Sequence, residues 1–168
     1  GILGEDGPEG IDIGFNTIGA PHRELQKVLK SLHAQGVLLA VSSKNELKNV
    51  EAVFNKRKDM VLQISDFSAI EANWQNKSNA ISRILRKLNL TEPGTIFLDD
   101  SPFERNEVKS QLPNVIVPDL PDDPADWAAF LFESQLFQIP FSTQEDLQRN
   151  KFYKAEETRR KIKDKVSP

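Results

Sequence analysis

The chain has 168 residues, a formal net charge of -3, no cysteine and only two histidines. This length suits one domain with a single core. The absence of cysteine excludes disulfides, thiolate metal sites and cysteine nucleophiles in this chain. Because there are also only two histidines, we expect any metal to be bound through oxygen. The negative charge argues against nucleic acid as a partner, and no apolar run approaches the roughly 20 residues of a membrane span, so we expect a soluble, cytoplasmic protein.

The amino-terminal part of the chain predicts a loop, a helix and a strand in that order. Residues 1–20 are rich in glycine and acids and have no periodic pattern, which is typical of a loop. From Pro21 apolar residues recur at helical spacing until Gly36, where a helix is expected to end. Residues 37–41 form a continuous apolar run, as in a parallel strand covered on both faces, and polar residues 42–45 follow.

The middle of the chain repeats this alternation. A second helix is predicted with Asn45 as its N-cap, followed by a short strand at residues 60–64. We expect this helix to bury Leu47, Val50, Val53 and Phe54. A third helix has an apolar face made of Ile81, Ile84, Leu85 and Leu88. Pro93-Gly94 then turns the chain into a strand at residues 95–98, which ends at Asp99-Asp100.

The helix after the acidic pair has a well-defined predicted start. Ser101 can act as the N-cap, Pro102 suits the first helical position, and Glu104 completes a capping box. A strand at residues 115–117, a helix near 125–136 and a further capping signal at 142–145 follow. We expect most aromatic side chains to lie in the core, including Trp74, Trp127 and Phe132.

Alternating helices and short apolar strands predict an α/β fold with an open, doubly wound, mostly parallel sheet. Ligands of such sheets bind beyond the carboxyl ends of the strands. We assign residues 1–150 to this core and residues 151–168 to a charged helical tail or linker.

Polar residues at the predicted strand ends suit a divalent cation and a phosphate. Asp99 and Asp100 can bind Mg²⁺, whereas the Ser43 hydroxyl, the backbone N–H groups after Asn45 and the Lys77 ammonium can bind phosphate. Each residue also has a structural alternative, since Asp, Ser and Asn commonly cap helices and surface lysines are usually solvated. The order serine, lysine, acidic pair differs from that of phosphoacceptor receiver domains, in which an acidic pair comes first and the lysine last.

Several blocks of the sequence resemble the FkbH-like family of the haloacid dehalogenase (HAD) superfamily. They are GILGEDG at 1–7, GVLLAVSSKN at 36–45, NWQNK at 73–77 and FLDDSPFER at 97–105, with weaker likeness at 112–118 and 143–146. The resemblance implies a Rossmann-like HAD core without a large cap domain.

The same resemblance implies roles for the polar residues. Ser43 corresponds to the second-motif serine, Lys77 to the third-motif lysine, and Asp99-Asp100 to the acidic pair that binds Mg²⁺, with Lys44 and Asn45 beside the phosphate. FkbH-like proteins resemble enzymes that dephosphorylate a glycerate-type acyl phosphate, such as 1,3-bisphosphoglycerate, and load the three-carbon unit onto an acyl carrier protein in polyketide biosynthesis. The thioester step cannot be assigned here, because the chain has no cysteine.

One departure from the family is large. In such proteins the first block is preceded by a strand that ends in a DxDxT motif. This motif supplies the attacking carboxylate and the general acid and base. The present sequence has no such motif. The resemblance places that strand between residues 37–41 and 95–98, so we expect the natural protein to continue upstream and this chain alone to be inactive. The alternative is a non-catalytic HAD-like module that binds a protein partner.

Overall fold

The structure is a computed structural model that describes residues 20–137. The predicted amino-terminal loop, the capping signal at 142–145, the charged tail and the boundary at residues 150 and 151 lie outside the described residues.

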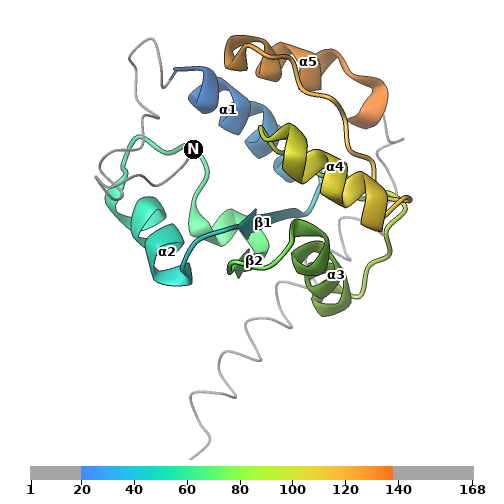
Figure 1. The fold of residues 1–168 in the computed structure, drawn as a ribbon. Coiled ribbons are helices and arrows are strands. Elements are labelled where there is room, and N and C mark those ends of the chain that lie inside the picture. Colours follow the sequence, from blue (N-terminus) through green and yellow to red (C-terminus); the bar gives the residue numbers. More distant parts are fainter. Residues whose placement is uncertain (1–19, 138–168) are drawn as a thin grey trace, which may run out of the picture.

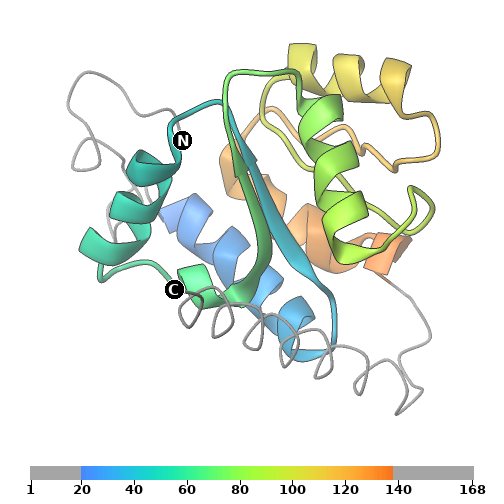
Figure 2. The same ribbon diagram turned by 90° about the horizontal axis from the view of Figure 1, so that it is seen from below.

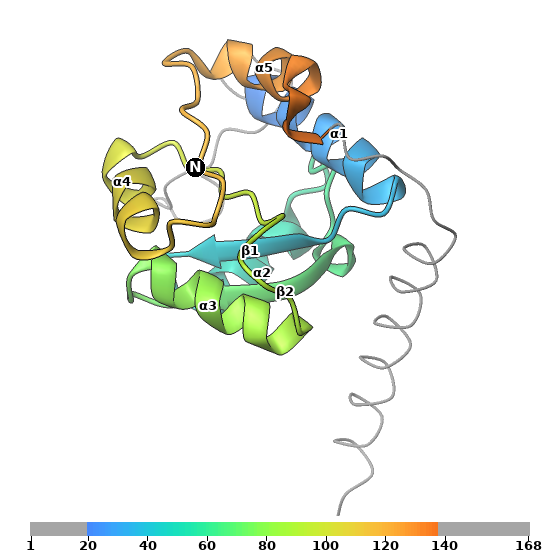
Figure 3. The same ribbon diagram turned by 90° about the vertical axis from the view of Figure 1, so that its right-hand side faces the viewer.

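Helices and parallel strands alternate along the described chain (Figure 1). The elements are α1 (Ala20–Ala34), β1 (Leu39–Ser43), α2 (Leu47–Lys56), η2 (Ile64–Asp66), β2 (Phe67–Ala72), α3 (Lys77–Leu88), α4 (Pro102–Gln111), η3 (Pro124–Asp126), α5 (Trp127–Glu133) and η4 (Gln135–Phe137). In Figure 3, α1 and α5 lie side by side on one side of the strands and α3 lies on the other. The predicted α/β class with a parallel sheet is confirmed, and no large cap domain interrupts residues 20–137.

The sheet is small and parallel. β1 pairs with β2 from Leu39 opposite Phe67 to Ser43 opposite Ala72, and the two strands run side by side in Figure 2. Further along the chain, Ile96 and Ile116 form a parallel bridge. Within residues 20–137 no backbone pairing joins β1 to residues 95–98, so β1 has a partner on one edge only.

The helix α3 connects the two parts of the core. Its Ile84 and Leu88 pack with Ala69 of β2, while its Ile81 and Leu85 belong to a second cluster. The other members of that cluster come from α4 and the bridged segments and are Phe97, Val108, Leu112, Val115 and Val117. The predicted apolar face of this helix is therefore confirmed.

The predicted strand at residues 60–64 is wrong, because side chains take up the backbone donors of this segment. The Gln26 side-chain oxygen accepts hydrogen bonds from the backbone N–H groups of Val61 (3.0 Å) and Leu62 (3.1 Å). Asp66 accepts another from the backbone N–H of Gln63 at 2.8 Å. These bonds replace a strand ladder, and the strand begins only at Phe67.

Other boundaries also differ from those expected. Asn45 is not the N-cap of α2, since Glu46 occupies that position, and Leu47 is 46% exposed rather than buried. The strand predicted at residues 37–41 lies two residues later, at Leu39–Ser43. The strands predicted at residues 95–98 and 115–117 are reduced to the single bridge.

The carboxyl-terminal helices and the aromatic residues agree with expectation only in part. The helix predicted near residues 125–136 is α5 flanked by two 3₁₀ turns. Trp127 is buried and donates a hydrogen bond from Nε1 to the Pro121 carbonyl at 2.7 Å. The core positions predicted for Trp74 and Phe132 are wrong, because these side chains are 72% and 81% exposed.

Candidate functional site

Lys77 and Asp99 lie together beyond the carboxyl end of β1. The Lys77 ammonium donates a hydrogen bond to the Ser42 carbonyl at 2.5 Å and lies 3.5 Å from Oδ2 of Asp99. Both side chains are about nine-tenths buried, at 10% and 12% exposure. Residues that are 22 positions apart in sequence therefore meet where the parallel-sheet rule places a ligand.

Ionisation of the Asp99 carboxyl group is less favourable in the folded protein than in water. Burial raises the pKa of Asp99 above its usual value, and the neighbouring carboxyl of Asp100 raises it further. The backbone N–H of Ser101 and the charge of Lys77 act in the opposite direction without cancelling the effect. Asp100 itself is exposed. A divalent cation beside this pair would remove the penalty, because it favours both ionised carboxylates.

The loop that carries the acidic pair is held by the start of α4. The N-cap Ser101 accepts a hydrogen bond from the backbone N–H of Glu104 at 3.4 Å, as predicted. The backbone N–H of Ser101 donates to Oδ1 of Asp99 at 2.9 Å. Arg105 donates from Nη1 to the backbone carbonyls of Asp99 at 2.9 Å and of Asp100 at 3.1 Å. These bonds fix the conformation of the acidic loop.

The structure places Ser43 and Lys44 at the same end of the sheet. The Ser43 carbonyl accepts a hydrogen bond from the backbone N–H of Asn73 at 3.0 Å, which joins the loops that follow β1 and β2. The ammonium of Lys44 lies 2.5 Å from Oε1 of Glu104 and 5.9 Å from the ring centroid of Phe103. Lys44 is thus already paired with a carboxylate of α4.

Two predictions about the residues at this end of the sheet need correction. The side-chain oxygen of Asn45 accepts hydrogen bonds from the Glu46 backbone N–H at 2.8 Å and from Asn49 at 3.0 Å, so it shapes the approach to α2 rather than capping it. The capping box predicted for α4 is only half formed, because the Glu104 carboxylate contacts Lys44. Ser42 Oγ and Glu104 Oε2 are buried with no hydrogen-bond partner in the described structure.

The donor set suits Mg²⁺ better than zinc. Residues 20–137 contain no group of three or more His, Cys, Asp and Glu side chains arranged around one point. Mg²⁺ commonly uses one or two carboxylates and completes its coordination with water and phosphate oxygens. Asp99 and Asp100 offer carboxylate oxygens of the kind that such a cation takes.

The sequence did not identify Arg105 or Glu107 as parts of this region, and it assigned Glu104 only to the capping box of α4. All three belong to α4, and their side chains contact the acidic loop, Lys44 and the start of α3 respectively. Apart from the capping box at Glu104 and the family-like block at 97–105, the signal for them is a run of charged residues on a helix that buries just Val108. Such a run usually indicates a solvated face, so the sequence alone would not have distinguished them.

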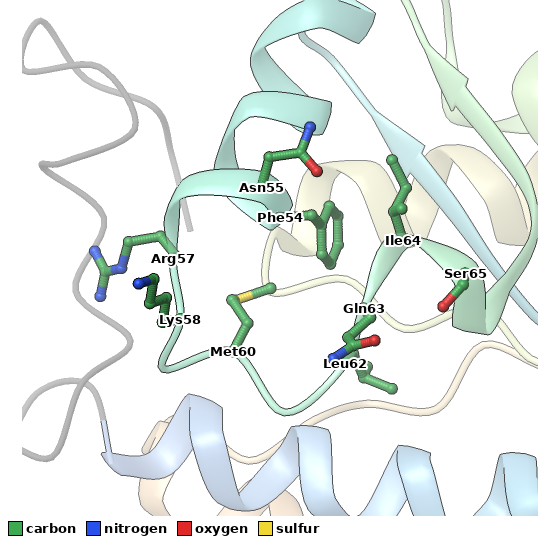
Figure 4. A pocket seen from close by; sticks show the side chains of 9 residues that line it. All are labelled: Phe54, Asn55, Arg57, Lys58, Met60, Leu62, Gln63, Ile64 and Ser65. Atoms are coloured by element: carbon green, nitrogen blue, oxygen red, sulfur yellow. The ribbon is translucent and has the colours of Figure 1, made fainter.

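A cavity of about 390 Å³ lies in another part of the molecule (Figure 4). It is formed by the end of α2 and the segment that precedes β2, with lining residues that include Phe54, Arg57, Met60 and Ile64. The Arg57 guanidinium beside this cavity is paired with Asp59 at 2.7 Å. The cavity is therefore at the amino end of β2, away from Lys77 and Asp99, and contains none of the predicted site residues.

In residues 20–137 we also find no helix with the length and apolarity that a membrane crossing requires.

Comparisons with known proteins support the fold. No protein-family model and no curated protein matched the chain. Among solved structures, it is similar to the N-terminal part of the protein BF1531 from Bacteroides fragilis, a crystal structure that contains a phosphatase domain complexed with Mg. The two are 39% identical, with a TM-score of 0.76 over 85% of this chain. The match spans 37% of the length of that solved chain.

Proposed function

We propose that this chain forms most of a Mg²⁺-dependent phosphatase or phosphotransferase domain of the HAD type. The observation that carries the proposal is the buried Lys77 beside Asp99, a carboxyl group whose pKa is raised by burial and by Asp100. A 39% identical structure with a phosphatase domain and Mg supports the same chemistry.

The roles follow from charge and position. Asp100, with Asp99 beside it, would hold Mg²⁺, which supplies positive charge to the phosphate oxygens when bound. Lys77 faces the same place with an ammonium that offsets negative charge on the phosphoryl group. Ser43 would donate its hydroxyl to a phosphate oxygen, and Lys44 would add positive charge nearby. Asn45 helps to set the course of the loop that carries them.

In this proposal the attacking carboxylate would come from outside residues 20–137. Within residues 20–137, β1 is paired on one edge only. A strand added at this free edge would end beside Lys77 and the acidic pair. Its first Asp would attack phosphorus while the second Asp of the motif donates a proton to the leaving ester oxygen. The second Asp would then accept a proton from the water that hydrolyses the resulting acyl phosphate.

The finer assignment rests on sequence resemblance. The blocks at 36–45, 73–77 and 97–105 resemble FkbH-like proteins, and the substrate would be a glycerate-type acyl phosphate such as 1,3-bisphosphoglycerate. The thiol of an acyl carrier protein would attack the acyl carbon and displace the acyl phosphate as inorganic phosphate, so that the three-carbon group becomes a thioester in polyketide biosynthesis. A carrier protein is the partner that this assignment requires.

A non-catalytic HAD-like binding module is the second candidate. It is favoured by the contacts that Lys44 and Asn45 already make within the protein, since both behave as structural residues in this arrangement. In that case Lys77 and Asp99 would be a buried pair with no substrate.

Phosphate release by the full-length protein distinguishes these candidates. We expect release from an aryl phosphate that requires Mg²⁺ and is lost in Asp100→Asn. Asp122→Asn is the matched control, because Asp122 is also an exposed loop carboxylate but lies far along the chain from the pair. A folded protein that neither binds Mg²⁺ nor releases phosphate would contradict the enzyme proposal and favour the binding module.

A further inference from the structure

The helix that begins with Lys77 is capped by a residue of a different helix. The N-cap of α3 is Asn76, whose side chain makes no capping hydrogen bond, and the first turn contains no acidic residue. Instead Glu107 of α4 accepts a hydrogen bond at Oε2 from the backbone N–H of Ser78 at 3.1 Å. The Ser78 hydroxyl donates a second hydrogen bond to Oε1 of the same carboxylate. Ser78 is 5% exposed.

This contact has the properties of a strong helix cap. The first backbone N–H groups of a helix have no partner within the helix, and a negative charge at this end is favoured by the helix dipole. Hydrogen bonds to an ionised acceptor are stronger than those between neutral groups. Because both carboxylate oxygens of Glu107 contact one residue, they restrain the position and the rotation of the first turn of α3.

The same helix α4 restrains the other half of the site. Arg105, two residues before Glu107, donates to the backbone carbonyls of Asp99 and Asp100. Figure 2 shows α4 beside α3. One helix therefore holds both the acidic loop and the turn from which Lys77 projects, and these two parts meet where the Lys77 ammonium lies 3.5 Å from Asp99.

We propose that Glu107 is a positioning residue for Lys77. It does not reach the phosphate; it holds the start of α3 so that the ammonium of Lys77 lies where charge develops during phosphoryl transfer. The inference rests on the proposed function, since it assumes that Lys77 acts on a phosphoryl group. An ordinary structural cap would instead stabilise the protein without a specific effect on turnover.

Three variants of the full-length protein separate these possibilities. Glu107→Ala removes both hydrogen bonds to Ser78. Glu107→Gln keeps an oxygen that can accept from the Ser78 N–H and an amide that can donate to its hydroxyl. Asn106→Ala is the matched control, because Asn106 is the exposed neighbour on the same helix.

We expect Glu107→Ala to lower kcat for an aryl phosphate by about 10–100-fold, as is usual when a group that orients a site residue is removed. KM should change by less than about threefold, because the lost contribution belongs mainly to the transition state. Glu107→Gln should recover most of the rate, and Asn106→Ala should resemble the wild type. An unchanged kcat in Glu107→Ala, or an equal loss in both Glu107 variants, would overturn the proposal.

Amide hydrogen exchange in the same proteins gives a second result that does not depend on activity. Exchange at residues 77–81 should be faster in Glu107→Ala than in Asn106→Ala, with the rest of the described chain unaffected. Unchanged exchange there would overturn the capping contact. A wild-type protein that releases no phosphate would contradict the proposed function, and the exchange result would still decide whether Glu107 orders the start of α3.

Discussion

Two lysine–aspartate pairs occupy different regions of this molecule and differ in how well the charge of the aspartate is compensated. In the pair between α1 and η2, Lys30 lies 2.6 Å and 2.8 Å from the two carboxylate oxygens of Asp66. In the pair at the strand ends, Lys77 lies 3.5 Å from Asp99. The aspartate side chains are almost equally exposed, at 11% and 12%, but the Lys30 side chain is 43% exposed whereas that of Lys77 is 10% exposed, so the strand-end pair is the more deeply buried one.

The partners of the two aspartates explain the difference. Burial would raise the pKa of Asp66, but hydrogen bonds from the Gln63 backbone N–H and from Lys30 outweigh it and hold the pKa below its usual value. Burial raises the pKa of Asp99, and Asp100 adds a repulsive charge. A compensated pair stabilises a fold, whereas a buried carboxyl group next to a second one is typical of a site that binds a cation or carries out chemistry.

Replacing each lysine tests this distinction most strongly. Lys77→Met should lower phosphate release by the full-length protein by about 10²–10³-fold, as expected for loss of a group that stabilises transition-state charge. Lys30→Met should leave kcat within about threefold of the wild type, because Lys30 lies in the pair that we assign to stability. Kinetics with an aryl phosphate at saturating Mg²⁺ measure both effects, and equal losses would contradict the assignment.

Replacing Asp66 should affect stability rather than activity. Asp66→Ala leaves the Gln63 N–H and Lys30 without their partner, which we expect to cost about 2 kcal/mol in the free energy of unfolding. Because the pKa of Asp66 is lowered in the folded state, its stabilisation is present above the unfolded pKa of about 3.9 and is lost as pH falls through the folded value. Urea unfolding should therefore show a difference from wild type at pH 7 that shrinks on acidification below about pH 4.

Replacing Asp99 should change the free energy of unfolding by less than replacing Asp66 does, and in the opposite direction. The pKa of Asp99 is raised in the folded state, so its favourable contribution is present below the unfolded pKa and is lost as pH rises through the folded value. At neutral pH without Mg²⁺, Asp99→Asn should then be slightly more stable than the wild type. Thermal unfolding in a chelating buffer measures this difference, and a clear loss of stability would mean that Asp99 is a compensated structural residue like Asp66.

The helices were predictable because local patterns determine them. The spacing of Ile81, Ile84, Leu85 and Leu88 defines the buried face of α3 without any knowledge of its partners. Gly36 ends the first helical segment with a φ of 106°, a conformation that glycine adopts readily. Strands were less predictable, because their existence depends on a neighbour. Residues 60–64 are apolar enough for a strand, yet Gln26, which is distant in sequence, takes two of their backbone donors.

The site was also predictable only where a local rule of the fold decides it. The meeting of Lys77 with Asp99 could be predicted, since both were expected to follow strands of one parallel sheet, although within residues 20–137 the segment before Asp99 forms only the bridge between Ile96 and Ile116. The capping of α3 by Glu107 and the hold of Arg105 on the acidic loop could not, because these contacts depend on how α3 and α4 are placed against each other. The functional roles of Lys77, Asp99, Glu107 and Ser43 stay predictions.

Mg²⁺ binding measured through thermal unfolding tests the contrast between the two pairs most directly. If the strand-end pair is a cation site, Mg²⁺ at about 100 times its dissociation constant should stabilise the wild type by about 2.7 kcal/mol. Asp66→Ala should gain the same increment from its lower starting stability, and Asp99→Asn should gain much less. A shift in Asp99→Asn equal to that of the wild type, or no shift in any of the three folded proteins, would contradict the account.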